Sequence, residues 1–322
     1  MAQERSLDAG VGGPEAGPVT TTAPAPAPPG TRRRGSGPAV LMVLGSCTSL
    51  QIGAACAAQL FPRTGSSGAT FLRLLVAAVL LLPLTRPALH RWGRGQWGAV
   101  VLFGLSLAAM NGSFYESIGR IPLGTAVTIE FLGPLTLAAV LSRRLRDLTW
   151  VALAAAGVAL LGLSDGGVAG SLDPVGVGFA LVAGVFWALY ILASARVGKV
   201  VPGHGGLAVA IAVAALALLP FGLHGALVTA GDGHLLLLAA GTGVLASVIP
   251  YTLELAALRR LPPPVFGVLL SLEPAIAATA GWLLLGQRLG PWQGVAVGVV
   301  VLASVGSTLT ARRTAAEAPL PA

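Results

Sequence analysis

Residues Leu123 to Ser142 read LGTAVTIEFLGPLTLAAVLS, and this stretch decides the fold class. It contains one charged side chain, Glu130, among apolar and small residues. A helix of about 20 mostly apolar residues is long enough to cross the hydrocarbon core of a bilayer. The sequence therefore predicts a transmembrane helix over 123–142 with a carboxyl group inside it.

Nine further stretches of the same kind are present in the chain. Their approximate ranges are 39–61, 67–85, 98–118, 148–164, 177–195, 205–223, 234–255, 265–285 and 291–310. The 322 residues are 55% hydrophobic and only 10% charged, whereas a soluble domain carries about 25% charged residues. Because lipid cannot satisfy an exposed backbone, each stretch must be helical. The predicted fold class is an all-α membrane protein with ten transmembrane helices.

The two ends of the chain differ in composition from these stretches. Residues 1–37 are rich in Pro, Gly and Ala, so we expect a disordered cytoplasmic tail there, and 311–322 form a second cytoplasmic tail. Cys47 and Cys56 point to opposite sides of one helix and cannot pair within it. The low charge excludes a cytosolic enzyme, and the basic residues are scattered in short clusters, which argues against nucleic-acid binding.

The distribution of Lys and Arg predicts the orientation. With the N-terminus in the cytoplasm and the loops alternating, 15 basic residues in clusters beside the spans fall inside. The basic residues that fall outside are Arg63, Arg120 and Arg288, and the outside loops also hold Asp165, Asp173 and Asp232. Cytoplasmic loops of membrane proteins carry the excess of Lys and Arg. We therefore expect a multi-pass plasma-membrane protein with both termini in the cytoplasm.

The two halves of the chain resemble each other. Ala77–Leu84 reads AAVLLLPL and Ala214–Phe221 reads AALALLPF. The same residue types recur in the same order in Glu130, Pro134, Arg146 and Trp150 and in Glu273, Pro274, Arg288 and Trp292. Since each half holds five spans, an odd number, the halves enter the membrane from opposite sides. This predicts two inverted five-helix repeats, at 38–164 and 177–310, as in secondary transporters with a site near the midplane. Chance likeness among Ala- and Leu-rich helices is the alternative.

Glu130 and Glu273 are the first candidate site residues. They lie about seven and eight residues into their spans, roughly 10–12 Å deep at about 1.5 Å per residue. A carboxylate at that depth costs several kcal/mol unless it is paired, wetted or protonated. Pro134 and Pro274 deprive the carbonyls of Glu130 and Leu270 of their helical donors. The pattern predicts a proton or cationic-amine site in a central cavity, and a carboxyl that caps or crosslinks helices is the alternative.

Three other polar side chains inside spans are further candidates. Arg73, about six residues into its span, could hold a substrate carboxylate or neutralise a glutamate, or it could snorkel to the nearer interface. Gln51 and Asn111 are predicted substrate contacts, with interhelical hydrogen bonding as the alternative. Glu254 lies near a span end, just before Arg259 and Arg260, and is assigned to the membrane interface.

Four aromatic residues complete the predicted substrate-binding set, namely Tyr115, Trp187, Tyr190 and Tyr251. Aromatic residues at span ends usually belong to the interfacial belt, which is the alternative for each of them. Trp187 and Tyr190 are three residues apart, mid to late in their span, and are therefore the better cavity candidates.

No catalytic residue, metal site or cofactor is predicted. The chain has no phosphate-binding Gly-rich loop with Lys, no H-E-x-x-H and no D-D-x-x-D pattern, and its four histidines lie in or beside loops. An intramembrane transferase is the enzyme alternative, and it would require Asp or His clustered at one membrane face. A structural scaffold is the plainest alternative, but it does not account for two deep carboxyls.

Several stretches resemble a known family. They are Ser49–Pro62 (SLQIGAACAAQLFP), Met110–Leu135 (MNGSFYESIGRIPLGTAVTIEFLGPL), Trp187–Leu192 (WALYIL), Pro250–Leu261 (PYTLELAALRRL), Phe266–Ala275 (FGVLLSLEPA) and Gly306–Leu309 (GSTL). The chain resembles the EamA-type members of the drug/metabolite transporter superfamily, and among them the bacterial inner-membrane threonine/homoserine exporters. Where that family usually has Leu-Gly-Glu at the end of the ninth span, this chain has Leu285-Gly286-Gln287.

The resemblance implies a secondary transporter that exports small amino acids or related metabolites by proton antiport with alternating access and without ATP. By motif position, Glu130 and Glu273 are then the substrate-binding and proton-coupling residues. Small-molecule substrate, protons and membrane lipids are the expected partners, and a homodimer is an allowed assembly. Export of another small metabolite or a cationic drug is the alternative.

Overall fold

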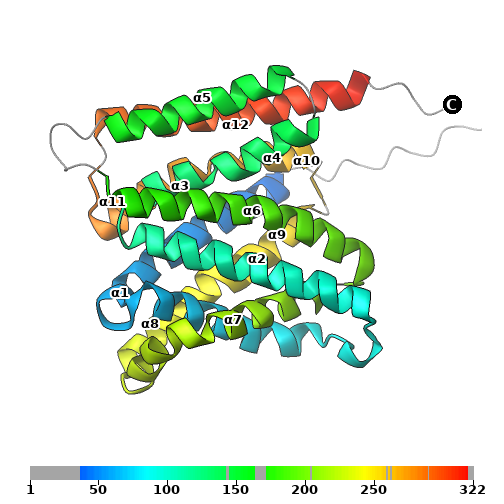
Figure 1. Cartoon of the computed structure of the whole chain (residues 1–322), viewed down its shortest axis with the longest axis vertical. Helices are drawn as coiled ribbons and strands as arrows, with labels where there is room; N and C mark the ends of the chain where they lie inside the picture. The colour runs from blue at the N-terminus through cyan, green and yellow to red at the C-terminus, as the bar shows by residue number, and fades with distance from the viewer. Residues whose placement is uncertain are drawn as a thin grey trace, which may run out of the picture. The chain divides into compact units, whose positions relative to one another are not determined.

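The computed structural model describes residues 37–142, 145–163, 172–203, 205–258, 260–261, 263–288 and 290–317, and within them every regular element is helical (Figure 1). The elements are α1 (Gly37–Thr85), η1 (Leu89–Arg91), α2 (Arg94–Ile118), α3 (Leu123–Glu130), α4 (Leu132–Ser142), α5 (Leu145–Leu163), α6 (Pro174–Val200), α7 (Gly205–Ala230), α8 (Gly233–Gly243), η2 (Val244–Val248), α9 (Ile249–Leu258), α10 (Pro263–Leu270), α11 (Glu273–Leu285) and α12 (Pro291–Glu317). The predicted N-terminal tail lies outside the described residues except for Gly37, which begins α1.

Helices overlap each of the ten predicted ranges. Among the described residues, eight helical stretches are long and apolar enough to cross a membrane, and Asp147–Leu161 in α5 is a shorter apolar helix. The first, α1, contains two predicted ranges, and its 49 residues are divided at Gly65, where φ is +71°. Glycine adopts this left-handed conformation without the steric penalty of a Cβ. Gly65 therefore separates a first arm of α1 from a second arm.

Two other helical stretches are interrupted next to a carboxyl. The turn at Phe131 separates α3 from α4 directly after Glu130, and the turn at Ser271 and Leu272 separates α10 from α11 directly before Glu273. A proline cannot donate the backbone hydrogen bond that continues a helix, and such positions bend or break helices. Pro134 and Pro274 follow these two breaks, as the sequence predicts.

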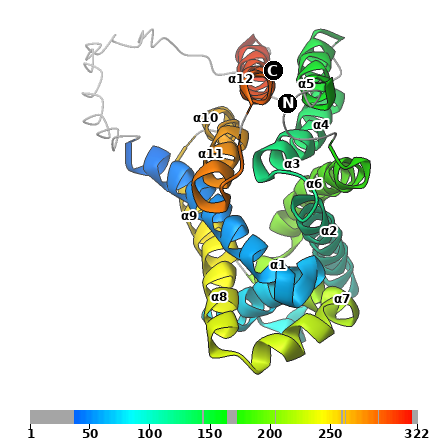
Figure 2. The same cartoon turned by 90° about the vertical axis from the view of Figure 1, so that its left-hand side faces the viewer.

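The helices form two groups, which Figure 2 shows side by side. In one group the first arm of α1 packs against η2, α9, α10 and α11, and α8 approaches the second arm at Gly243 and Val76. In the other group α6 packs against α2, α3 and α4. The second arm of α1 packs along α7, and α5 packs along α12. Each group therefore combines helices from both halves of the sequence.

Small residues allow the closest of these approaches. A Cβ on Gly133 of α4 would lie 1.9 Å from the carbonyl oxygen of Gly184 in α6, and a Cβ on Gly124 of α3 would lie 2.6 Å from the Cα of Ala278 in α11. Helices in membranes pack through such small residues because lipid provides no hydrophobic force between helices. The α4–α6 and α3–α11 contacts thus fix the positions of the two helix breaks.

Candidate functional site

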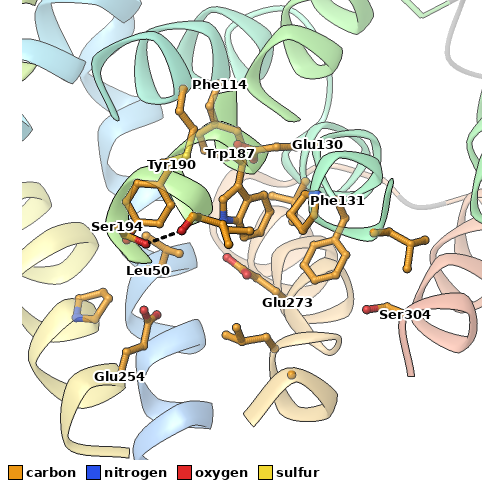
Figure 3. Close-up of a pocket in the computed structure, with 18 of the residues that line it drawn as sticks. Leu50, Phe114, Glu130, Phe131, Trp187, Tyr190, Ser194, Glu254, Glu273 and Ser304 are labelled. Atoms are coloured by element: carbon orange, nitrogen blue, oxygen red, sulfur yellow. Dashed lines mark hydrogen bonds between the residues drawn. The ribbon is translucent and has the colours of Figure 1, made fainter. Parts of the chain in front are cut away.

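A cavity of about 470 Å³ lies at the two helix breaks, lined by residues of α1, α2, α3, α4, α6, η2, α9, α10, α11 and α12 (Figure 3). Eight of the nine side chains predicted to form a site line it: Gln51, Arg73, Asn111, Glu130, Trp187, Tyr190, Tyr251 and Glu273. Glu130 and Glu273 are only 7% and 6% exposed. Each half of the sequence thus contributes its predicted deep carboxyl to a shared space.

Arg73 is buried beside this cavity and does not snorkel. The side chain is 3% exposed, and its three nitrogens donate to Ser247 Oγ (2.9 Å), the Ala246 carbonyl (2.6 Å) and Tyr115 Oη (3.2 Å). None of these partners is charged, and the described residues offer Arg73 no ion pair. The cavity therefore has a fixed positive charge on its wall that no ion pair within the described residues neutralises.

Tyr115 is the one predicted site residue that does not line the cavity. Its side chain is fully buried behind Arg73, with the guanidinium 5.4 Å from the ring centroid. It also packs against Phe61 and Phe114. Its contacts with Arg73 are thus a hydrogen bond and a cation–π contact, and these hold the guanidinium in place.

The two deep carboxyls have different surroundings. Gln51 Nε2 donates to Glu273 Oε1 at 3.2 Å, while the Gln51 Oε1 atom is buried without a partner. The carboxyl of Glu130 has no hydrogen-bond partner among the described residues. Since a buried polar group without a partner is costly, both sites favour the arrival of a hydrogen-bonding ligand or a proton.

The carbonyl that Pro134 leaves without a helical donor does not face the cavity as expected. The backbone oxygen of Glu130 points at Gly184, where a Cβ would come within 2.7 Å of it. The close packing of α6 against the break covers this oxygen. The carboxyl of Glu130, and not its carbonyl, is therefore the group available to a ligand.

Glu254 belongs to the cavity and not to the membrane interface, which corrects the sequence-based assignment. It lines the cavity, and Ser46 Oγ donates to its Oε1 at 2.7 Å. In Figure 3 the carboxyls of Glu254 and Glu273 both point toward the space beside Tyr190. The helical spacing of Ser247, Tyr251 and Glu254 is the signal that could have placed it, because residues four and then three apart share one helix face.

The sequence reasoning also missed two walls of the cavity. Ser304, Ser307 and Thr308 of α12 provide a hydroxyl-rich wall, and Phe114, Phe131 and Phe266 extend the aromatic lining around Trp187 and Tyr190. Ser and Thr at helical spacing in an apolar span carry no distinctive signal. In the part of the chain that the structure describes, no three His, Cys, Asp or Glu side chains are grouped as metal ligands.

The cavity is closed at one end by α3 and α11. Gln287, which follows α11, accepts a hydrogen bond at its Oε1 from the backbone N–H of Leu123, the first residue of α3, at 3.0 Å. Pro122, the residue before α3, provides no side-chain cap. At the other end α4 and α10 make no comparable contact within the described residues. Gln287 therefore caps α3 from the other half of the chain.

The described residues form eight helical stretches of membrane-spanning length, with buried charges around a cavity between two helix groups, which is the architecture expected of a multi-pass membrane transporter for a small molecule. The sequence profile described as "EamA-like transporter family" matches residues 174–309. The chain belongs to the EamA-like transporter family and is a transporter, not an enzyme.

Two curated relatives are similar over most of their length. Threonine/homoserine exporter RhtA of Escherichia coli (strain K12) is 40% identical over 276 residues, covering 85% of this chain and 92% of the relative. The protein of the same name from Salmonella typhimurium (strain LT2) is 41% identical over 280 residues, with the same coverage. A solved structure described as "Crystal structure of protein" shares the fold, with a TM-score of 0.56, 18% identity and coverage of 86% of this chain and 98% of that one.

Proposed function

We propose that this chain exports small amino acids of the threonine or homoserine kind, or related metabolites, across the plasma membrane in exchange for protons. The observation that carries the proposal is the cavity in which the buried guanidinium of Arg73 faces buried, unneutralised carboxyls. The relatives described as threonine/homoserine exporters support the substrate class. Energy then comes from the proton gradient.

A zwitterion fits this charge pattern. Arg73 uses three of the five N–H groups of a guanidinium on its protein partners, which leaves two for a substrate carboxylate. The substrate ammonium would bind Glu130, which has no other partner, or Glu273. A cation that binds there favours release of a proton from the same carboxyls, which links substrate to proton.

The two-repeat arrangement is supported by the helix packing. Gly222 and Gly225 of α7 pack on the second arm of α1, and α3–α11 and α5–α12 likewise pair corresponding spans of the two halves. The first arm of α1 contacts the third and fourth spans of the second half, and α6 contacts those of the first half. A two-fold axis between inverted five-helix repeats, 38–164 and 177–310, accounts for these pairs. The eight membrane-length stretches then give ten spans, because α1 crosses the membrane twice and the shorter α5 adds one more crossing.

The predicted alternation of loops between the two faces of the membrane is supported by two ion pairs. Arg63 lies 3.9 Å from Asp232, and Arg120 lies 3.5 Å from Asp173. All four residues belong to loops that the charge distribution assigns to the outside. Each pair therefore joins loops of the two repeats on one face of the membrane.

The asymmetry of the two ends of the cavity supports the proposed alternating access. The α3–α11 contact closes the cavity on the side of Leu123 and Gln287, which the topology assigns to the outside. The α4–α10 end lies toward the cytoplasm and is not closed by a matching contact. This conformation is then open inward, and export requires the α3–α11 contact to part while α4 and α10 approach each other.

We expect Gln287→Ala to loosen the outer gate. The hydrogen bond from Leu123 caps α3, and loss of a helix cap costs about 1 kcal/mol. The outward-open population should therefore rise about fivefold. The measurement is the rate at which a membrane-impermeant maleimide added outside labels Val127→Cys, a cavity-lining position, in a background with Cys47 and Cys56 replaced by Ser.

Gln96→Ala is the matched control. Gln96 also caps a helix start, since Gly93 N donates to its Oε1 at 2.9 Å, and its Nε2 donates to the Val200 carbonyl at 2.7 Å, but at the predicted cytoplasmic end. Its loss should not speed labelling from outside. Equal labelling rates in Gln287→Ala and the parent would show that Gln287 does not hold the gate.

The experiment that tests the proposed function is counterflow in proteoliposomes. Vesicles loaded with unlabelled threonine or homoserine should transiently accumulate the labelled amino acid from outside. A flat trace with protein shown to be folded and inserted would remove the amino-acid assignment. The same vesicles with an imposed pH difference test whether the gradient drives uptake against concentration.

We expect Glu130→Gln and Glu273→Gln each to lower gradient-driven transport by roughly tenfold or more, because a charge-assisted hydrogen bond contributes about 1.5–3 kcal/mol. Glu116→Gln is the control, since Glu116 lies outside the cavity and is bonded to Ser66. Unchanged efflux in both cavity variants would refute their role in coupling and binding.

A second candidate is export of a cationic solute. Three cavity carboxyls, Glu130, Glu254 and Glu273, face one guanidinium, and Trp187 and Tyr190 offer aromatic faces on which a cation can stack. Competition by hydrophobic cations, but not by threonine, would favour this function over amino-acid export.

A further inference from the structure

The contact between Glu254 and Ser46 distinguishes this carboxyl from the other two in the cavity. Ser46 is fully buried on the first arm of α1, and its hydroxyl lies 2.7 Å from Glu254 Oε1 and 3.3 Å from the Pro250 carbonyl oxygen. A hydroxyl carries one proton and can accept as well as donate. Ser46 thus has two acceptors within reach for a single proton.

This geometry satisfies both protonation states of Glu254. When the carboxyl is charged, the Ser46 hydroxyl donates to it. When a proton binds the carboxyl, the carboxyl O–H donates to Ser46 Oγ, and the Ser46 hydroxyl turns to the carbonyl of Pro250. Only hydrogen atoms change position, and Ser46 Oγ and Glu254 Oε1 keep each other as partners in both states.

The other two carboxyls lack such a partner. The amide of Gln51 can donate to charged Glu273, but it must turn over to present its unpartnered oxygen to a protonated one. Glu130 has no hydrogen-bond partner among the described residues. Their incomplete surroundings suit groups that bind a substrate, whereas Glu254 has the surroundings of a group that exchanges only a proton.

We propose that Glu254, supported by Ser46, is a separate proton-binding site of the transporter, which releases its proton to the cytoplasm when substrate enters. The inference rests on the proposed proton exchange and assigns one of its protons to a specific group. Glu254 lies one turn from the end of α9, which the topology assigns to the cytoplasmic side. A proton released there needs no path past the closed α3–α11 gate.

A single helical segment links this site to the substrate site. Arg73 binds the Ala246 carbonyl and Ser247 in η2, and η2 continues directly into α9, which carries Glu254. The η2 segment is a π-helix, a structure that occurs often at functional sites. Movement of Arg73 toward a substrate carboxylate would therefore shift α9 against Ser46.

Four titratable groups interact electrostatically with Glu254. They are Glu273 on α11, Tyr251 on α9 itself, Tyr190 on α6 and Cys47 on α1. Arg260 follows α9, but its guanidinium is directed to Met42 and is exposed. Glu273 is the carboxyl among these four groups, and like charges on Glu254 and Glu273 repel each other until a substrate ammonium compensates one of them.

The test is proton release by the purified protein in weakly buffered detergent with a pH dye. Addition of threonine should release protons from the wild type and about one proton fewer per bound threonine from Glu254→Gln. Glu116→Gln should match the wild type. If Glu254→Gln released as many protons as the wild type, the assignment would be overturned. A loss of threonine counterflow in that variant would also overturn it, because Glu254 would then bind substrate.

A spectroscopic signature tests the contact with Ser46 on its own. In infrared difference spectra recorded on adding threonine, a protonated-carboxyl band should disappear in the wild type, be absent in Glu254→Gln and lie at higher frequency in Ser46→Ala. An unshifted band in Ser46→Ala would refute the contact. Absence of both counterflow and proton release in the wild type would refute the proposed function itself.

Discussion

The Arg73→Gln variant is expected to lose about 30-fold or more in amino-acid transport, because removal of one partner from a buried charged contact costs about 2–5 kcal/mol. Arg73 is the one cationic side chain that lines the described cavity. Glutamine keeps a hydrogen-bonding group but removes the charge that would hold a substrate carboxylate. Initial rates of counterflow at several threonine concentrations measure the loss.

Arg63→Gln is the matched control for this loss. Arg63 is 64% exposed and 3.9 Å from Asp232, and exposed ion pairs contribute about 0–1 kcal/mol. Its removal should leave transport nearly unchanged. A readout specific to the carboxylate contact is the preference for an amino acid over the corresponding amine without a carboxylate, which Arg73→Gln should abolish. A folded Arg73→Gln protein with wild-type rate and preference would exclude this role.

Much of the fold could be predicted because membrane helices are limited by length and polarity. The break between 61 and 67 anticipates the division of α1 at Gly65, and Pro134 and Pro274 anticipate the interruptions beside Glu130 and Glu273. The first span of each half packs against the third and fourth spans of the other half, and this exchange could not be predicted from the sequence. The exchange depends on which helix faces approach closely. Glycines such as Gly124 and Gly184 allow these approaches, but glycine occurs throughout the chain and does not mark the contacting faces.

The site was predicted where a polar group lies deep in an apolar stretch, as for Gln51 and Arg73. The site was not predicted where the distance of a residue from the end of its span does not tell whether its side chain reaches the cavity. Glu254 lies near the end of its span, yet the cavity extends to it from the centre. Tyr115 shows the opposite case, because it was predicted to contact substrate, yet it does not line the cavity and its hydroxyl accepts a hydrogen bond from Arg73.

The second large effect concerns the α4–α6 contact, which places the Glu130 break. A Cβ on Gly133 would lie 1.9 Å from the Gly184 carbonyl oxygen, and backbone on both sides leaves no flexible side chain to move away. Overpacking costs about 1–3 kcal/mol and occasionally more, and this overlap falls at the upper end. We expect Gly133→Ala to lower the melting temperature in detergent by roughly 10 °C.

Gly178→Ala separates this steric effect from the general effect of replacing a helical glycine. Gly178 lies in α6 with nothing within 4 Å of its Cβ position, so alanine there should raise helix stability by up to about 1 kcal/mol. Thermal unfolding followed by tryptophan fluorescence compares the two variants.

Gly133→Ala should also weaken threonine binding, because α4 must move away from α6 and the preceding turn carries Glu130 with it. Equal melting temperatures would mean that α4 and α6 are farther apart than described, and the position of Glu130 in the cavity would then lose its structural basis.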